Sequence, residues 1–276
     1  MIPLEDLYTD VIGKAQRGLG VSDDELAAKT GLGPRAIHQI KNGHPEREPL
    51  ERIAAALDLH AESLIALSED RYRPVVPELE DGFAMFTTHY GSGMTVNSYL
   101  FWCAVARSAV AFDTGSTCSR IIATVKTAGA KIDAIFLTHT HPDHVADLRR
   151  LREYSKAPIF VGNEERLAEP KTIGISAGST SSAGPLQITA RATPGHSPGG
   201  MTYVVDGLPM PFAVVGDALF AGSMGGVAAE LYPSALKANR TQILSLPNNT
   251  ILCPGHGPLT TVGLEKKHNP FYAGRT

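Results

Sequence analysis

Apolar residues along the chain follow two different periodicities, and the change falls near residue 82. In the first 70 residues they recur at helical spacing, as Leu4, Leu7, Val11 and Ile12 do. Beyond residue 82 they form short runs of β type, separated by turn residues and a few helix-like stretches. The expected strands are residues 95–102, 109–112, 134–137, 159–161, 186–190, 201–205, 212–215 and 250–252, and the expected helices are residues 117–128, 143–154 and 234–244. Strands mixed with helices predict an α/β fold of packed sheets covered by helices.

The N-terminal stretch carries the start and stop signals of short helices. Ser22 followed by Glu25 is a capping box, which predicts a helix start. Gly31 is expected to end that helix, and Pro34 suits the first turn of the next one. These signals predict two helices joined by a tight turn.

This arrangement resembles the helix-turn-helix of the lambda-repressor/Cro family. The small Ala27 and the apolar Ile37 flank the turn at the spacing that lets two helices cross closely, and residues 49–59 supply the following helix. The resemblance covers most of residues 8–68.

Composition shifts divide the chain into three parts. Residues 1–70 form the predicted helical domain, residues 71–81 an exposed linker with two prolines, and residues 82–276 the larger domain. Within the larger domain, residues 176–184 are rich in Ser and Gly and are expected to form a flexible surface loop.

Composition and charge exclude several classes of protein. The chain is 43% hydrophobic and 19% charged, which is typical of a globular protein. No apolar run approaches the roughly 20 residues of a membrane helix. The acidic N-terminus has no signal-peptide pattern, and the three scattered cysteines do not suggest a disulfide framework, so we expect a cytoplasmic protein.

Five of the ten histidines lie in short motifs at predicted strand ends. The decisive motif places His139, His141, Asp143 and His144 within six positions after an apolar run. His139 and His141 point the same way in an extended segment, whereas the next two belong to a predicted helix start. The motif therefore offers two pairs of ligands to neighbouring metal ions, and imidazole with carboxylate suits zinc, iron or manganese.

Three further motifs place a candidate ligand directly after a glycine at the end of a strand. They contain His196, Asp217 and His256. Rigid strands deliver such loop residues to one site, and the preceding glycines permit the close approach that a crowded centre requires. Each motif taken alone is weak evidence for a metal site, because a Pro-Gly-His sequence is commonly only a turn.

Together, these motifs and their order resemble the metallo-β-lactamase superfamily, and within it the glyoxalase II-like hydrolases. The resemblance covers residues 82–276 and implies an αββα sandwich, two packed mixed sheets flanked by helices. It implies two divalent metal ions, with zinc expected and iron or manganese as alternatives. The implied ligands are His139, His141 and His196 for one ion, Asp143, His144 and His256 for the other, and Asp217 as the bridge.

The resemblance implies hydrolysis of a thioester or ester by metal-activated water, with Asp143 as a catalytic residue that orients the nucleophile or accepts its proton. Glutathione thioesters are the first substrate expected, although only 20 residues follow His256, fewer than a glutathione-gripping helical domain would occupy. A lactonase, a mononuclear-iron persulfide dioxygenase and a ligand-sensing DNA-binding regulator are alternatives. Asp217 stands where true β-lactamases of this fold commonly have cysteine, which argues against that activity.

Other residues with chemical potential are expected to have structural roles. Asp113 is expected to hold the metal loop by hydrogen bonds, and Cys253 to be a small buried residue. The remaining histidines are expected at the surface or in packing contacts: His38, His44, His60, His89 and His268.

The N-terminal domain is a weak candidate for DNA binding. Residues 1–73 hold nine Lys or Arg and thirteen Asp or Glu, a net charge of −4, which opposes phosphate binding. The expected recognition helix nevertheless has four outward positions, Arg35, His38, Gln39 and Lys41, and Arg and Gln are good base readers. Dimerisation, giving a homodimer, or a cover over the active site is favoured slightly over DNA binding.

Overall fold

A computed structural model describes residues 2–79, 81–165 and 167–275. Residues 1, 80, 166 and 276, which fall within the predicted domain and linker ranges, lie outside the described residues. The N-terminal region is helical, as predicted. Its helices are α1 (Tyr8–Leu19), α2 (Asp23–Thr30), α3 (Pro34–Lys41), α4 (Arg47–Ala56) and α5 (Ala61–Ser68).

The predicted signals at the start and end of α2 are present. The Ser22 hydroxyl accepts a hydrogen bond from the Glu25 backbone N–H, and the Glu25 carboxylate accepts one from the Ser22 N–H at 2.8 Å. Gly31 ends the helix with a φ of 68°, in the left-handed region that favours glycine. Ala27 and Ile37 are buried between the helices. The local geometry is therefore that of two helices joined by a tight turn.

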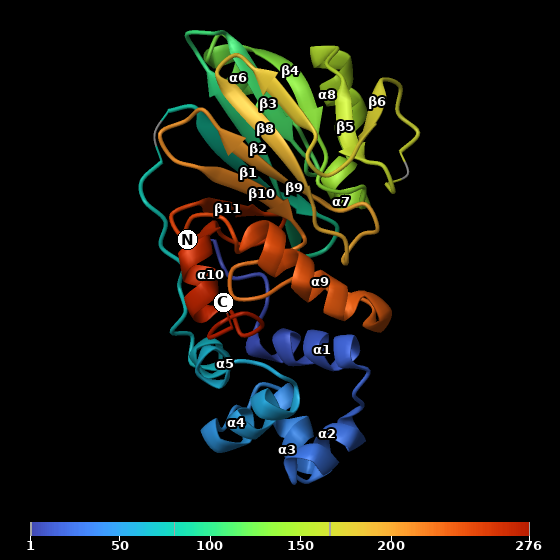
Figure 1. Ribbon diagram of the computed structural model, residues 1–276, viewed down its shortest axis with the longest axis vertical. Coiled ribbons are helices and arrows are strands. Elements are labelled where there is room, and N and C mark those ends of the chain that lie inside the picture. The colour runs from blue at the N-terminus through green and yellow to red at the C-terminus, as the bar shows by residue number, and fades with distance from the viewer. Residues whose placement is uncertain (1, 80, 166, 276) are drawn as a thin grey trace.

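The larger region consists of two mixed six-stranded sheets (Figure 1). The first sheet has the order β1-β2-β3-β4-β5-β6, with parallel pairing from β3 to β6. Its strands are β1 (Phe83–Tyr90), β2 (Met94–Cys103), β3 (Ser108–Phe112), β4 (Lys131–Phe136), β5 (Ile159–Gly162) and β6 (Thr172–Ile175).

The second sheet has the order β12-β11-β10-β9-β8-β7, and only β10 and β11 pair in parallel. Its strands are β7 (Thr180–Ala183), β8 (Leu186–Ala192), β9 (Met201–Asp206), β10 (Phe212–Gly216), β11 (Ile251–Pro254) and β12 (Thr260–Thr261). Aromatic side chains from both sheets fill the layer between them, including Phe101, Phe112 and Tyr203.

Helices cover the outer face of each sheet, which completes the predicted αββα order. The first sheet packs against α6 (Ser119–Thr127) and α8 (Leu148–Ser155) through a separate buried cluster. A short helix, α7 (Pro142–Val145), precedes α8. On the other side lie η1 (Ala229–Leu231), α9 (Tyr232–Ala238), its π-helical continuation η2 (Asn239–Ile243) and α10 (Val262–His268).

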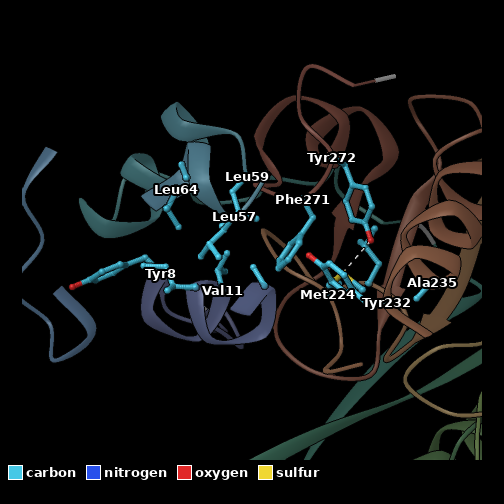
Figure 2. Packing of buried hydrophobic residues seen from close by; sticks show 14 of the residues in the cluster. Tyr8, Val11, Leu57, Leu59, Leu64, Met224, Tyr232, Ala235, Phe271 and Tyr272 are labelled. Atoms are coloured by element: carbon cyan, nitrogen blue, oxygen red, sulfur yellow. Dashed lines mark hydrogen bonds between the residues drawn. The ribbon is translucent and has the colours of Figure 1, made fainter. Parts of the chain in front are cut away.

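The N-terminal helices share a hydrophobic core with this outer layer. Figure 2 shows Val11 of α1 and Leu57, which follows α4, on one side of Phe271, with Met224 and Tyr232 on the other. Tyr72, within the predicted exposed linker, is also buried, and its hydroxyl donates to Glu265 of α10 at 2.6 Å. The helical region is therefore packed directly onto the sheet domain.

Three sequence expectations about the larger region are wrong in detail. Residues 180–183, expected in a flexible loop, form β7, because their backbone pairs with β8 at the sheet edge. The helix expected over residues 143–154 is divided into α7 and α8, and the one expected over 234–244 begins at Tyr232 and continues as a π-helix after Ala238. The sequence does not predict strands β1, β6 and β12.

Among the described residues, no helix is both long enough and apolar enough to cross a bilayer.

Candidate metal centre

The first group of candidate ligands follows β4, a buried central strand of the first sheet. The chain leaves β4 at Phe136 and turns into α7, whose N-cap is His141. Pro142 occupies the first helical position, where its fixed φ favours helix initiation. This tight strand-to-helix turn buries His139 and His144 and leaves His141 exposed. Strand and helix therefore fix both ends of the motif.

The other three candidates come from the second sheet. His196 follows β8, Asp217 follows β10 and His256 follows β11. Gly216 has a φ of 51°, and a Cβ atom at Gly255 would lie only 2.0 Å from Asp217 Oδ1. Glycine is thus required at both positions, one for its backbone conformation and one for close approach.

The fold brings all seven candidate residues together in three overlapping groups. Within each group the ligand atoms lie within 4.8 Å of one another. The groups are His139, His141 and His196; His139, His144 and Asp217; and Asp143, His144 and His256.

The shortest separations show how the groups join. His141 Nδ1 lies 3.1 Å from His139 Nε2 and 3.0 Å from His196 Nε2. Asp217 Oδ2 lies 3.3 Å from both His196 Nε2 and His256 Nε2, so this carboxylate stands between the first and the third group.

Two buried polar atoms at the centre indicate that a cation belongs there. His144 Nε2 and Asp217 Oδ1 have no hydrogen-bond partner among the described residues. They lie 3.3 Å apart. A buried polar atom without a partner is costly, whereas imidazole and carboxylate are good ligands for zinc and iron. The residues present therefore fit divalent metal ions.

The pKa shifts in the centre also indicate a site for a cation. Burial raises the pKa of Asp217, but His144 and His256 outweigh it and hold the pKa well below its usual value. Burial opposes protonation of His144 and His256, yet neighbouring carboxylates, led by Asp217 for His144 and by Asp143 for His256, raise their pKa values to about 10 and about 11. The carboxylates attract positive charge, which a metal ion would supply in place of these protons.

Backbone and side-chain partners orient the rings from behind. Asp113 Oδ2 lies 2.8 Å from His144 Nδ1, and Asp113 also accepts hydrogen bonds from the Thr138 backbone N–H and hydroxyl. His196 Nδ1 lies 3.0 Å from the Gly226 carbonyl oxygen, and His256 Nδ1 lies 2.5 Å from that of Thr95. Such contacts fix which ring nitrogen faces a metal. The structural role predicted for Asp113 is confirmed.

Residues that the sequence did not single out complete this support. Glu165, after β5, accepts hydrogen bonds from Thr140, Ser197 and Gly199 in the loops that carry His141 and His196. Its position among the turn residues that directly follow a buried strand was the available signal. The carbonyl groups of Thr95 and Gly226 carry no signal in the sequence, since every residue has one.

The remaining candidates lie away from the centre. Cys253 is buried in the core between the sheets, as expected. Arg35, His38 and Gln39 are exposed on α3, and Lys41 pairs with Asp23 at 2.6 Å.

The five histidines expected at the surface or in packing contacts are found there. His38, His44 and His89 are exposed. His60 caps α5, and His268 contacts the ring of Tyr72.

Comparison with known proteins identifies the family. Residues 91–256 match the model of the metallo-beta-lactamase superfamily, so the chain belongs to that superfamily. The chain is 30% identical to the probable metallo-hydrolase YqgX of Bacillus subtilis over 59% of its own length and 86% of that protein. It is 27% identical to the hydroxyacylglutathione hydrolase GloC of Haemophilus influenzae, over 63% and 92%.

The chain is also similar to a solved structure. The crystal structure of TTHA1623 in a di-iron-bound form matches with a TM-score of 0.51 and 30% identity, covering 67% of this chain and 99% of that one. Family membership and the His and Asp clusters together support a metal-dependent hydrolase.

Proposed function

We propose that the protein is a dinuclear-metal hydrolase that cleaves a thioester or an ester. The observation that carries this proposal is the joined set of ligand groups with two partnerless buried atoms, His144 Nε2 and Asp217 Oδ1, at its centre. One ion is assigned to the first group and the other to the third, with Asp217 shared between them. The first group is His139, His141 and His196, and the third is Asp143, His144 and His256.

When bound, such a pair of ions supplies a water of lowered pKa and a Lewis acid that polarises a carbonyl oxygen. Asp217 would hold the two ligand groups at a fixed separation. Asp143 would orient the nucleophile and accept its proton. Burial raises the pKa of Asp143, but His256 and His144 outweigh it and lower the pKa, so the carboxylate is ionised and able to accept that proton.

The substrate class is inferred from relatives. A protein 27% identical to this chain is named as a hydroxyacylglutathione hydrolase, which makes glutathione thioesters the first substrates to test. Zinc is the expected metal, and the di-iron form of a solved relative makes iron the first alternative. The complete third group favours two ions over the single iron of a persulfide dioxygenase.

The N-terminal helical region is proposed to form a fixed wall beside the His256 loop rather than a DNA reader. A Cβ atom at Gly257 would lie 3.0 Å from the Glu5 backbone nitrogen. Lys14 Nζ lies 4.8 Å from the centre of the Phe220 ring, which in turn lies edge-on to His256 at 5.6 Å. Helices α2 and α3, by contrast, lie at the end of the molecule remote from the sheets (Figure 1). Retarded duplex DNA in a gel shift at low salt would contradict this assignment.

A hydrolysis panel tests the proposed activity. The metal-loaded protein is assayed with glutathione thioesters, other thioesters and lactones, and oxygen uptake is followed with glutathione persulfide. We expect thioester hydrolysis without oxygen uptake, and its loss to background in Asp217→Ala. Asp206→Ala, an exposed position at the end of β9, is the matched control and should retain activity. Oxygen uptake or full activity in Asp217→Ala would overturn the proposal, and hydrolysis of lactones alone would overturn the thioester assignment in favour of a lactonase.

A further inference from the structure

The carboxylate of Glu165 joins loops from the two sheets. Oε2 accepts hydrogen bonds from the backbone N–H of Thr140 at 2.9 Å and from its hydroxyl at 2.6 Å. Oε1 accepts one from the Gly199 N–H at 2.9 Å and one from the Ser197 hydroxyl. Thr140 belongs to the loop after β4, and the other two belong to the loop between β8 and β9. One half-buried side chain therefore satisfies four donors in two separate loops.

The loops leave little room for Glu165 to move. Its own N–H donates to the Gly162 carbonyl at 2.9 Å, which closes the turn after β5. A Cβ atom at Gly162 would lie 2.0 Å from the Gly199 carbonyl oxygen, and one at Gly199 would lie 2.7 Å from the Glu165 nitrogen. Backbone thus packs on backbone, and the carboxylate is held at a fixed distance from both loops.

Each of these loops carries candidate metal ligands next to the residue that Glu165 binds. Thr140 separates His139 from His141, and Ser197 directly follows His196. His141 Nδ1 and His196 Nε2, contributed by the two sheets, lie 3.0 Å apart. The relative position of these two rings therefore depends on the Glu165 carboxylate, which joins their loops.

The bridge requires an ionised carboxylate. Two of the four donors are backbone N–H groups, which cannot reverse their role. Burial raises the pKa of Glu165, but the hydrogen bonds from Ser197, Thr140 and Gly199 outweigh it and lower the pKa. A glutamine could not replace it, because its amide nitrogen would face one of the two N–H groups donor to donor.

We propose that Glu165 is a positioning residue that fixes the geometry of the metal site formed by His139, His141 and His196. The proposal rests on the metal centre of the proposed function. It distinguishes that site from the site of Asp143, His144 and His256, because Glu165 binds Thr140 between His139 and His141, whereas Asp143 and His144 lie on α7 and His256 follows β11.

Metal titration of Glu165→Gln tests the proposal without reference to activity. The metal-free protein is titrated with cobalt(II) against a competing chelator, and the visible absorption of each bound ion is followed. We expect one of the two ions to bind about 10–100-fold more weakly, with a changed spectrum, as is typical when a partner behind a ligand is lost. The second ion should be affected far less.

Glu164→Gln is the matched control, because it removes the same charge from the adjacent, exposed residue. It should bind both ions as the unsubstituted chain does. Identical affinities and spectra in Glu165→Gln and Glu164→Gln would overturn the positioning role. Failure of the unsubstituted chain itself to bind cobalt would instead overturn the proposed function.

A second pair of variants covers the case in which Glu165→Gln does not fold. Thr140→Val removes one of the four donors while preserving shape, and Thr140→Ser keeps the hydroxyl. We expect Thr140→Val to bind the same ion more weakly and Thr140→Ser to bind it as the unsubstituted chain does. Equal weakening in both variants, or in neither, would contradict the proposal.

Discussion

At the scale of single residues, the centre is built by side chains that hold other side chains. Asp113 shows this most clearly. It is 1% exposed and adopts a positive φ of 53°, which is uncommon outside glycine. That conformation turns its carboxylate back toward Thr138 and His144. Backbone strain is thus accepted where it places a carboxylate behind a candidate metal ligand.

Replacing Asp113 with Asn should weaken the metal site that contains His144. The carboxylate accepts from the His144 ring nitrogen, the Thr138 N–H and the Thr138 hydroxyl, and an amide can serve only part of this set. We expect binding of one ion to weaken about 10–100-fold, measured by cobalt titration. This ion should be the one that Glu165→Gln leaves largely unaffected. Unchanged affinity relative to Asp206→Asn would contradict this account of Asp113.

The sequence revealed the ligands themselves but not most of their supports. His196, Asp217 and His256 could be predicted because each follows a glycine at the end of an apolar strand, and Asp113 because it ends such a run. The position of Glu165 after a buried strand was only a general signal, because its role depends on residues in two loops, 25 and 32 positions away in the chain.

At the scale of elements, α10 anchors the loop that follows Asp217. Glu265 of α10 is fully buried and accepts a hydrogen bond from the Gly222 N–H at 3.0 Å and from Tyr72 at 2.6 Å. Asn269 donates to the Ser223 carbonyl in the same loop at 2.8 Å. The loop, the helix and the segment that leaves α5 are therefore held by one buried carboxylate.

This buried carboxylate should give stability a measurable pH dependence. Burial raises the pKa of Glu265 above its usual value of 4.5, and the hydrogen bonds it accepts only partly oppose this. The unfolded chain therefore ionises first as pH rises. The contribution of Glu265 to stability is fully present below about pH 4.5 and is lost as the pH rises from there through the higher pKa of the folded chain. Glu265→Gln lacks this titration.

Urea unfolding of the metal-free protein between about pH 4 and pH 8 provides the measurement. The free energy of unfolding of the unsubstituted chain should fall with pH relative to that of Glu265→Gln. Titration of the histidines is common to both proteins and cancels in the difference. A difference that stays constant or grows with pH would contradict the assignment.

The sequence predicted the strands whose burial produces an apolar run. It missed strands that are defined mainly by hydrogen bonds to a neighbouring strand. The central strands β3, β4 and β10 are buried along most or all of their length, and their apolar runs made them visible. Strand β7 consists mainly of Thr and Ser at a sheet edge, so its hydrogen bonds to β8 left no hydrophobic signal. Strand β1, at the edge of the other sheet, does begin with an apolar run, residues 83–86, but three of those four positions are only partly buried.

At the scale of the whole molecule, one hydrophobic cluster joins the N-terminal helices to the sheet domain (Figure 2). Helix α1 contacts η1 and α9, and its Gly18 packs against Tyr232 of α9. A Cβ atom there would lie 2.4 Å from the ring of Tyr232. The surface of α1 therefore matches α9 closely, which the helical periodicity of the sequence predicted only as an apolar face without a partner.

Two glycines of α1 give a matched test of this contact. Ala is favoured over Gly in a helix by about 0.5–1 kcal/mol. Gly13→Ala should gain this stability, because its Cβ would meet nothing closer than the Arg17 side chain at 3.4 Å. Gly18→Ala should instead lose about 1–3 kcal/mol, because the Tyr232 ring must move. Chemical unfolding measures both, and a gain in Gly18→Ala equal to that in Gly13→Ala would contradict the packing.

The number of metal ions bound per chain tests the central claim most directly. The metal-free protein is dialysed to equilibrium against zinc, and the metal content is determined by elemental analysis, with Asp217→Ala alongside. We predict two ions per chain, and no more than one tightly held ion in the variant, because Asp217 lies between the two ligand groups. Zero or one ion in the unsubstituted chain, or two in the variant, would contradict a dinuclear metal centre.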